Sequence, residues 1–341
     1  MKINFVMGEM TNLRYIIPLI IEATERGISS DVYVFWNVNE KYSAPHRNKD
    51  SLIHLSEKYN FTLKDVVREW EDVNNTHLTF FTEGMMHKAH GVPSVIKNSP
   101  DQIFVCTATM ADSMHHFKNY VEFADYISFP NDMHVKEYNL KSDKIVYLGS
   151  PKYDRLQDLP EYVPSERKRA LLIWPSPDRV SYIDFSQIMH VLKANDFEVY
   201  VKSRGEHKGE APPQFYGDGH FKDTTHGDWY PHITMCLINQ SDLIIQFDSA
   251  TVKECVMLEK PVINFRIDGV RSPRFYNYLY DDCDSVIDLP YGDSSNFEAI
   301  DRSIKTLSSQ DNNKILKDTK EKYLWSYNAS KRLLDYFGDR I

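Results

Sequence analysis

Apolar and polar positions alternate along the chain in blocks that predict strands and helices in turn. Residues 2–7 form a short apolar run that predicts a strand, and residues 13–25 repeat apolar side chains at the three- and four-residue spacing of a helix. Gly27 follows that helix at a position where glycine commonly ends one, and residues 31–36 predict the next strand. Because strand, helix and strand follow one another, we expect parallel pairing in an α/β sheet.

The first half of the chain continues this alternation. Helical spacing predicts one helix over residues 51–59 and a second near residues 63–70. Four further apolar runs predict strands, at residues 78–81, 103–107, 126–129 and 144–148.

A break in the pattern after residue 150 indicates two domains. Glycine and proline cluster there in a charged stretch with few apolar residues, and the alternation restarts at residue 170. The restarted pattern predicts strands at 170–174, 197–202, 243–247 and 261–265, and helices at 183–194, 233–240 and 251–258. The fold class predicted is α/β with two Rossmann-like lobes facing a cleft. The predicted divisions are an N-terminal lobe at 1–150, a hinge at 151–168, a C-terminal lobe at 169–310, and C-terminal helices at 311–341 that can pack back on the N-terminal lobe.

The segment from Gly205 to Tyr230 differs from its surroundings because it is rich in Gly, Pro, His and Asp. That composition is too polar for a core and predicts a long loop at the surface or in the cleft. Trp229 and Tyr230 at its end are candidates for stacking on a sugar or a base, although most aromatic residues serve in cores.

Composition narrows the classes of partner. The chain has 341 residues and a formal net charge of -9, which argues against nucleic acid or an anionic membrane surface as the main partner. The four cysteines lack CxxC spacing, which indicates buried thiols in a reducing, cytoplasmic compartment rather than a zinc site or disulfides. No apolar run reaches the length of about 18 residues that an integral membrane segment needs. The sequence does not indicate an oligomeric state.

A small polar break, Asp248-Ser249-Ala250-Thr251, lies where the predicted strand 243–247 passes into a helix. In open parallel sheets ligands bind beyond the carboxyl ends of strands, where helix N-termini present N–H groups. The hydroxyls and N–H groups of this break could bind phosphate, and Glu254, one turn into the helix, could accept hydrogen bonds from a ribose. The alternative is that Asp248 or Ser249 only caps the helix.

Several strings in the second half resemble known enzymes. "DSATVKE" followed by "LEKPVINF" resembles the D-S-x-x-x-x-E, then L-x-K-P-V, signature of GT-B fold glycosyltransferases and of the non-hydrolysing UDP-N-acetylglucosamine 2-epimerases. "KIVYLGSPKYDRL" resembles the end of the N-terminal lobe in these enzymes and in the CDP-glycerol glycerophosphotransferases. "VYVKSRGEH" is similar to their Lys-Pro-His element, with Ser203 and Arg204 in place of Pro and His. The matching elements span residues 120 to 265.

The resemblance implies a nucleotide-sugar donor held by the C-terminal lobe, with residues 248–251 beside its phosphates and Glu254 on its ribose. The leaving nucleoside diphosphate needs cations or oriented donors, and no DxD-type metal motif lies in a suitable loop. We therefore expect no metal and no cofactor. The residues predicted to bind the nucleotide-sugar are Ser176, Arg179, Lys202, Arg204, Asp248, Ser249, Ala250, Thr251 and Glu254.

The acceptor side requires a general base on a loop of the N-terminal lobe. Glu83 follows the strand "LTFF", Glu9 follows the first strand, and Asp112 follows "FVCTAT"; these three are the catalytic candidates, with Glu83 preferred. Glu254 has no second glutamate at the spacing that retaining enzymes show, which favours inversion.

The predicted function is a glycosyltransferase that moves a sugar from a nucleotide-sugar to a carbohydrate or glycolipid acceptor in surface polysaccharide or glycan synthesis. Three alternatives stay open. They are a nucleotide-sugar 2-epimerase or a polyol-phosphate transferase on the same fold, and a non-catalytic protein that binds a nucleotide or glycan.

Overall fold

The computed structural model describes residues 2–36, 44–66, 78–82, 103–108, 117, 121–137, 139–203, 209–222, 229–266, 283–309, 312–323 and 328–338. The chain divides into two compact units. The first contains residues 1–155, 227–230 and 324–341, and the second contains residues 156–226 and 231–323.

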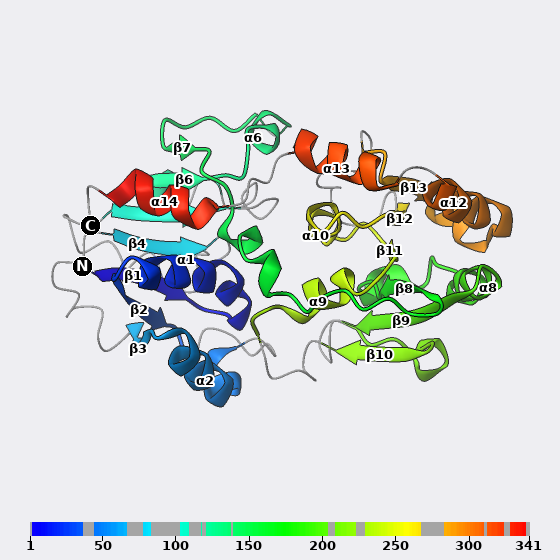
Figure 1. Ribbon diagram of the computed structural model, residues 1–341, viewed down its shortest axis with the longest axis horizontal. Helices are drawn as coiled ribbons and strands as arrows, with labels where there is room; N and C mark the ends of the chain where they lie inside the picture. Colours follow the sequence, from blue (N-terminus) through cyan, green and yellow to red (C-terminus); the bar gives the residue numbers. More distant parts are fainter. Residues whose placement is uncertain are drawn as a thin grey trace. The chain divides into compact units, whose positions relative to one another are not determined.

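The first unit is built on a sheet whose strand order is β3-β2-β1-β4-β5-β6-β7, and every neighbouring pair in it is parallel (Figure 1). Its strands are β1 (Lys2–Met7), β2 (Ser29–Val34), β3 (Thr62–Asp65), β4 (Leu78–Thr82), β5 (Ile103–Thr107), β6 (Tyr126–Ser128) and β7 (Ile145–Val146). The described helices of this unit are η1 (Met10–Asn12), α1 (Leu13–Glu25), η2 (Pro45–Asn48), α2 (Lys49–Tyr59), α6 (Met133–Glu137), η4 (Pro151–Tyr153) and α14 (Ala329–Phe337).

Two buried layers of side chains enclose this sheet because its central strands are apolar on both faces. One layer joins alternate residues of β1, β2 and β4 to helices α1, α2 and α14. Trp229 and Tyr230 belong to it, with 4% and 6% of their surface exposed. The prediction that these two aromatics lie in a surface or cleft loop is therefore wrong. Their large apolar rings are buried in this core, although the residues that precede them in the sequence are mostly polar.

The C-terminal helix α14 is fixed to the first unit by the "GSPKYD" string. Asp154 accepts hydrogen bonds from the N–H groups of Ala329 and Ser330 at 2.7 and 2.5 Å, which satisfies the first turn of the helix. Gly149 has φ +96°, and a Cβ there would lie 2.7 Å from the Cβ of Ala329 at the start of α14. Glycine is thus required where the chain passes beneath the helix.

The second unit is built on a six-stranded parallel sheet in the order β10-β9-β8-β11-β12-β13. Its strands are β8 (Lys168–Ile173), β9 (Phe197–Ser203), β10 (Gly219–Lys222), β11 (Leu243–Gln246), β12 (Val262–Arg266) and β13 (Val286–Pro290). The described helices are η5 (Leu156–Asp158), α7 (Pro177–Val180), α8 (Phe185–Ala194), η6 (Pro213–Phe215), α9 (Ile233–Asn239), α10 (Val252–Met257), η8 (Tyr291–Ser295), α12 (Phe297–Ser309) and α13 (Asn312–Tyr323).

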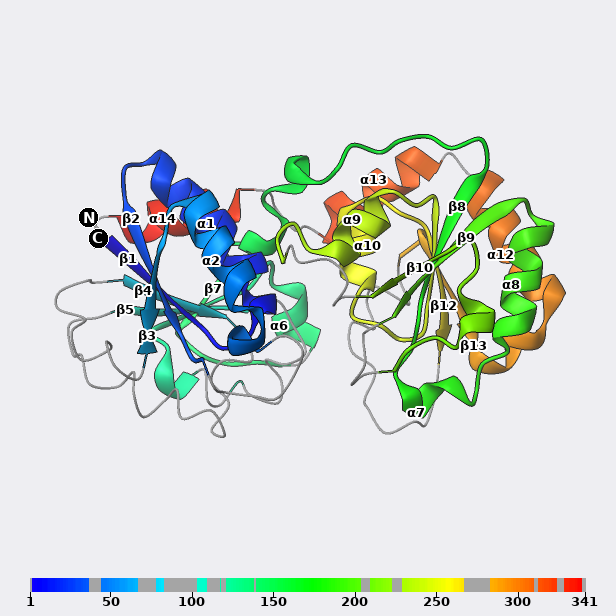
Figure 2. The same ribbon diagram turned by 90° about the horizontal axis from the view of Figure 1, so that it is seen from below.

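Helices cover both faces of the second sheet. Figure 2 shows α8 and α12 on one face and α9 and α10 on the other. The α8 and α12 side buries a continuous core that includes Ile188, Leu192, Ile300 and Ile304 against β8, β9, β11 and β12. The predicted fold class, α/β with two Rossmann-like lobes, is confirmed by these two parallel sheets.

Two local predictions need correction. Residues 62–65, expected within a helix near 63–70, form edge strand β3 beside β2. The segment 205–230, expected to be a loop, contains edge strand β10 at residues 219–222. Two further elements were not predicted: strand β13, in which only Val286 is buried, and helix α12, although its buried Ile300, Ile304 and Leu307 repeat at helical spacing. Within the described part of the chain, no helix combines the length and apolar character needed to cross a bilayer.

Candidate functional site

Both sheets contain a topological switch point, where the chain stops adding strands on one side and continues on the other. In the first unit this point lies between β1 and β4, and in the second between β8 and β11. Ligands of open α/β sheets bind beyond the carboxyl ends of the strands at such points. The segments that follow these four strands are therefore the candidate ligand-binding segments.

The segment after β11 forms a tight corner at Asp248–Thr251. Asp248 has φ +44°, a left-handed conformation that aspartate tolerates better than most residues. The hydroxyls of Ser249 and Thr251 lie 2.8 Å apart, and Ser249 Oγ accepts the N–H of Thr251 at 3.3 Å. The N-cap of α10 is Thr251, with no hydrogen bond from its own side chain to the helix. Ala250 is exposed, so solvent reaches this corner.

Helix α10 carries the predicted ribose-binding residue. Glu254 lies in its first turn and is 6% exposed, and its neighbour Lys253 is 1% exposed. Burial, with a smaller contribution from the Glu254 carboxylate, raises the pKa of the Cys255 thiol well above its usual value. Cys255 is therefore a neutral packing group, and the helix also buries two ionisable side chains, Lys253 and Glu254.

The segment after β8 reaches across the switch point to the corner. Ser176 is the N-cap of α7, and Arg179 on that helix donates from Nη1 to the backbone carbonyls of Phe247 and Asp248, at 3.0 and 3.2 Å. The structure thus brings Ser176 and Arg179 together with the corner. Part of the Arg179 guanidinium holds the backbone there. Lys202 lies in β9 and is 4% exposed, and Arg204 falls outside the described residues.

A buried amide beneath the corner was not predicted. Asn264, in β12, is fully buried, and its Oδ1 accepts the Asp248 N–H at 2.8 Å while its Nδ2 donates to Asp248 Oδ1 at 3.0 Å. The same Nδ2 donates to Asp288 Oδ1 at 2.7 Å, and Asp288 lies 3.5 Å from Arg266 Nη1. One signal was available in the sequence. An asparagine interrupts the apolar run "PVINF", where it would need buried hydrogen-bond partners.

The switch point of the first unit contains one of the three predicted bases. Glu9 follows β1, and Asn12 bridges from this loop to the end of β4 by donating from Nδ2 to Thr82 Oγ1 at 2.7 Å. Asn12 Oδ1 also accepts the N–H groups of Gly8 and Glu9, at 3.1 and 2.9 Å. Glu83 and Asp112 fall outside the described residues. Among the residues that the structure describes, no group of three or more His, Cys, Asp or Glu side chains is arranged to hold a metal ion.

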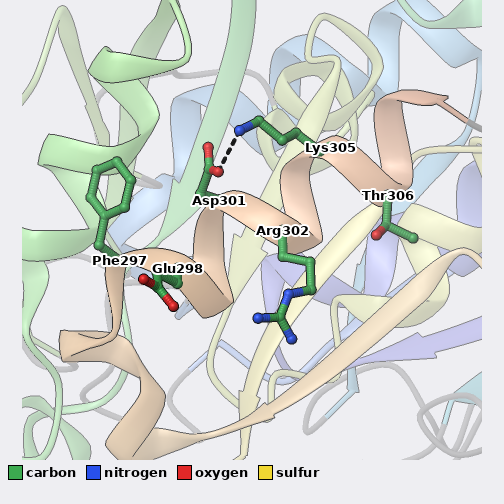
Figure 3. Close-up of a pocket in the computed structure, with 6 residues that line it drawn as sticks. All are labelled: Phe297, Glu298, Asp301, Arg302, Lys305 and Thr306. Atoms are coloured by element: carbon green, nitrogen blue, oxygen red, sulfur yellow. Dashed lines mark hydrogen bonds and ion pairs between the residues drawn. The ribbon is translucent and has the colours of Figure 1, made fainter.

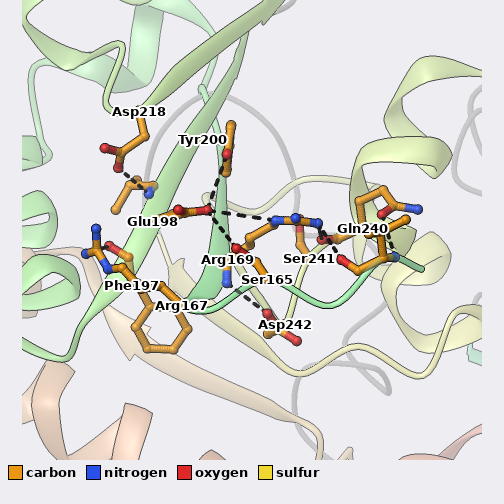
Figure 4. Close-up of polar contacts among 12 residues, drawn as sticks. Ser165, Arg167, Arg169, Phe197, Glu198, Tyr200, Asp218, Gln240, Ser241 and Asp242 are labelled. Carbon is orange, nitrogen blue, oxygen red and sulfur yellow. Dashed lines mark hydrogen bonds and ion pairs between the residues drawn. The ribbon is translucent and has the colours of Figure 1, made fainter.

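Two other polar regions of the second unit have different characters. A surface depression of about 500 Å³ is lined by six residues from α12 alone, where Asp301 is paired with Lys305 at 2.6 Å (Figure 3). At the amino ends of the strands, Asp242 accepts from the Arg169 N–H, and Arg169 lies 3.9 Å from Glu198 (Figure 4). Asp242 also accepts from the Tyr162 hydroxyl. The two hydrogen bonds to Asp242 join the start of β11 to the start of β8 and to the segment that precedes β8. We therefore assign this cluster a role in the fold rather than in binding.

Comparison with known proteins identifies the fold. No protein-family model matches the sequence, and no curated protein matches it. A Listeria monocytogenes protein assigned as a UDP-N-acetylglucosamine 2-epimerase is similar in structure, with a TM-score of 0.67 at 11% identity over 99% of this chain and 96% of that chain. The UDP-GlcNAc 2-epimerase of Neisseria meningitidis, solved with UDP-GlcNAc bound, has a TM-score of 0.66 at 14% identity over 99% and 100%.

A glycosyltransferase from Rickettsia africae is also similar, with a TM-score of 0.55 at 15% identity over 99% of this chain and 98% of that chain. At these identities the likeness shows the fold alone. The chain has the GT-B fold that nucleotide-sugar epimerases and glycosyltransferases share, as its motifs predicted.

Proposed function

We propose that this chain is a glycosyltransferase that binds a nucleotide-sugar at the switch point of its second unit and transfers the sugar to a carbohydrate or glycolipid acceptor. One observation carries the proposal. The segments after β8 and β11 meet through Arg179 at the point where α/β sheets bind ligands, in a chain with the GT-B fold.

The corner supplies the groups that a donor requires. The hydroxyls of Ser249 and Thr251 and the N-terminal end of α10 suit the diphosphate, and Arg179 adds positive charge beside it. Glu254, one turn into α10, is the proposed acceptor of hydrogen bonds from the ribose diol. The charge that develops on the leaving nucleoside diphosphate would be met by these groups, together with Lys202 and Arg204, without a metal ion.

The acceptor hydroxyl would lose its proton to a carboxylate of the first unit. Glu9 lies directly beyond β1 at the switch point of that unit, and Glu83 follows Thr82, which Asn12 ties to the Glu9 loop. We propose one of these two glutamates as the general base of an inverting transfer, with Glu83 preferred and Asp112 as the third candidate.

A 2-epimerase is the second candidate, because a structural neighbour with a TM-score of 0.66 is a UDP-GlcNAc 2-epimerase, solved with UDP-GlcNAc bound. The two activities differ in what they need. An epimerase alters UDP-GlcNAc without an acceptor, whereas a transferase releases the nucleoside diphosphate only when an acceptor is present. Product analysis of a donor-only incubation therefore separates them.

The first experiment measures thermal stabilisation by UDP, GDP, CDP, CMP and ADP. A ligand at 100 times its Kd should raise the free energy of unfolding by about 2.7 kcal/mol. We expect Glu254→Gln to weaken binding of the stabilising nucleotide at least tenfold without unfolding the free protein, since the substitution keeps the shape of the side chain and removes its charge. Glu198→Gln, at the opposite end of the sheet, is the matched control.

Two results would contradict the proposal. If no nucleotide stabilises the wild-type protein, the chain does not bind an activated donor. If Glu254→Gln binds nucleotide as tightly as the wild type, the ribose is not recognised by this residue.

A further inference from the structure

We propose that Asn264 is the positioning residue of the donor site: its buried amide holds the Asp248–Thr251 corner in the conformation that binds the donor diphosphate. This inference rests on the proposed function. It concerns a residue that would not touch the donor and acts through Asp248.

Two contacts from Asn264 fix the conformation of Asp248. Its φ of +44° is left-handed, a conformation of higher energy for a residue with a side chain, although aspartate tolerates it better than most. Asn264 contacts both the backbone and the side chain of Asp248, by accepting the N–H at 2.8 Å and donating to Oδ1 at 3.0 Å. Two contacts to one residue define the direction of its backbone as well as its position. Arg179 holds the carbonyl of the same residue from the α7 side at 3.2 Å.

The hydrogen-bonding capacity of the Asn264 amide is fully used. Oδ1 also faces the Nε2 of Gln246 at 3.4 Å, and Nδ2 also donates to Asp288 Oδ1 at 2.7 Å. The amide therefore links β11, β12 and β13 at the end of the sheet that carries the corner. A buried network in which each bond of the central group is made is rigid, because any movement leaves a polar atom unsatisfied.

The charges around Asn264 make its chemical identity important. Its Nδ2 separates two carboxylates, those of Asp248 and Asp288, and Arg266 partly balances Asp288 at 3.5 Å. Aspartate at position 264 would have almost the same shape. It would, however, place an acceptor against two acceptors in a buried site, and repulsion would displace Asp248.

The test compares UDP with uridine, because only UDP carries the phosphates that the corner would bind. We expect Asn264→Asp to weaken UDP binding at least tenfold while changing uridine binding less than twofold, measured by calorimetric titration and competition. Asn195→Asp is the matched control, since Asn195 also donates to a carboxylate, that of Asp301 at 3.0 Å, in the same unit. It should bind UDP as the wild type does.

A compensated variant provides the rescue. In the triple variant Asn264→Asp with Asp248→Asn and Asp288→Asn, the amides at positions 248 and 288 can both donate to the carboxylate at 264, and asparagine tolerates the left-handed conformation. We expect this variant to recover at least half of the lost binding free energy for UDP. If Asn264→Asp does not fold, the triple variant carries the test alone, and a folded triple variant that binds UDP more than tenfold more weakly than the wild type overturns the inference.

The remaining outcomes are distinct. Wild-type affinity for UDP in Asn264→Asp overturns the positioning role and leaves the proposed function intact. Equal losses for UDP and uridine would show a general structural role and also overturn it. Absence of nucleotide binding by the wild-type protein overturns the proposed function, and the positioning role with it.

Discussion

The two switch points of this chain are both stabilised by a buried asparagine, but the groups that the two asparagines contact differ. Each has a buried asparagine whose Oδ1 accepts a backbone N–H of the loop and whose Nδ2 bonds a side chain of a neighbouring strand or loop. In the first unit this residue is Asn12, which bonds Thr82, and in the second it is Asn264, which bonds Asp248 and Asp288. An amide suits this task because it offers both donors and acceptors and carries no charge that burial would penalise.

The partners differ in charge. The Asn12 side-chain amide bonds two N–H groups and a hydroxyl, so the groups that it contacts are neutral. Asn264 lies between two carboxylates with Arg266 nearby, so the second switch point maintains charges at the end of the sheet. Stability alone does not require such an arrangement, since buried charge is costly. We therefore expect Asn12 to contribute mainly to the stability of the fold, and Asn264 to contribute mainly to the geometry of the donor site.

The largest effect is expected for Asn12→Ala. The substitution removes three hydrogen bonds and leaves the N–H groups of Gly8 and Glu9 without this acceptor, which should lower the free energy of unfolding by about 3 kcal/mol. Urea denaturation measures the loss. Affinity for the nucleotide that stabilises the wild type in the thermal screen should stay within twofold, because the substitution lies in the other unit.

Asn131→Ala is the matched control, because Asn131 Oδ1 accepts a backbone N–H, that of Met133 at 3.0 Å, near the surface. Its cost should be below about 1 kcal/mol. Similar losses for the two variants would show that Asn12 is an ordinary loop residue rather than the support of the switch point.

Thr82→Val should have an intermediate effect. Thr82 is 1% exposed, and valine keeps its volume while removing the hydroxyl that accepts from Asn12 Nδ2. We expect a loss of about 1–2 kcal/mol in the free energy of unfolding, with the Asn12 bonds to the loop retained. A loss as large as that of Asn12→Ala would mean that the bridge to β4, rather than the loop contacts, supports the structure.

The smallest effect is a pH dependence that neutral asparagines cannot produce. Asp154 supports the start of α14 with its carboxyl group, and burial raises the pKa of that group despite the hydrogen bonds from the helix. Folding therefore favours the protonated acid. The resulting stability is fully present below the unfolded-state pKa near 3.8 and is lost as pH rises through the higher folded-state pKa.

Asp154→Asn should remove this dependence. Between pH 4 and pH 7, the free energy of unfolding of the wild type should fall relative to that of the variant. A difference between the two proteins that stays constant across this range would show that Asp154 does not titrate with folding.

The sequence was sufficient for the fold class and for the corner itself. Helical and strand spacing located most central strands, and the polar break at Asp248–Thr251 stood out between two apolar runs. These features are local, because period and turn chemistry are properties of neighbouring residues. The edge strands β3 and β10 were missed because their conformation depends on residues that are distant in the sequence. Their residues are only partly buried, so their apolar pattern is weak and pairing with β2 and β9 decides their conformation.

The support of the corner could not be predicted. Asn264 and Asp288 are 24 residues apart, and their contact depends on β13 pairing beside β12. Asn12 and Thr82 are separated by 70 residues. Such contacts follow from strand order, which a single sequence specifies only through the complete fold. The buried asparagine in "PVINF" indicated that partners were needed without indicating which ones.

The division of the chain has a practical consequence for protein engineering. Residues 227–230 and 324–341 belong to the same unit as residues 1–155, so the polypeptide passes from one unit to the other four times. A recombinant fragment ending at residue 155 would lack Tyr230, Leu333 and Phe337, and would expose the apolar surface that they cover. Independent production of the first unit therefore requires both later segments to be joined to it, and gene fusions or exchanges at a single boundary would disrupt its core.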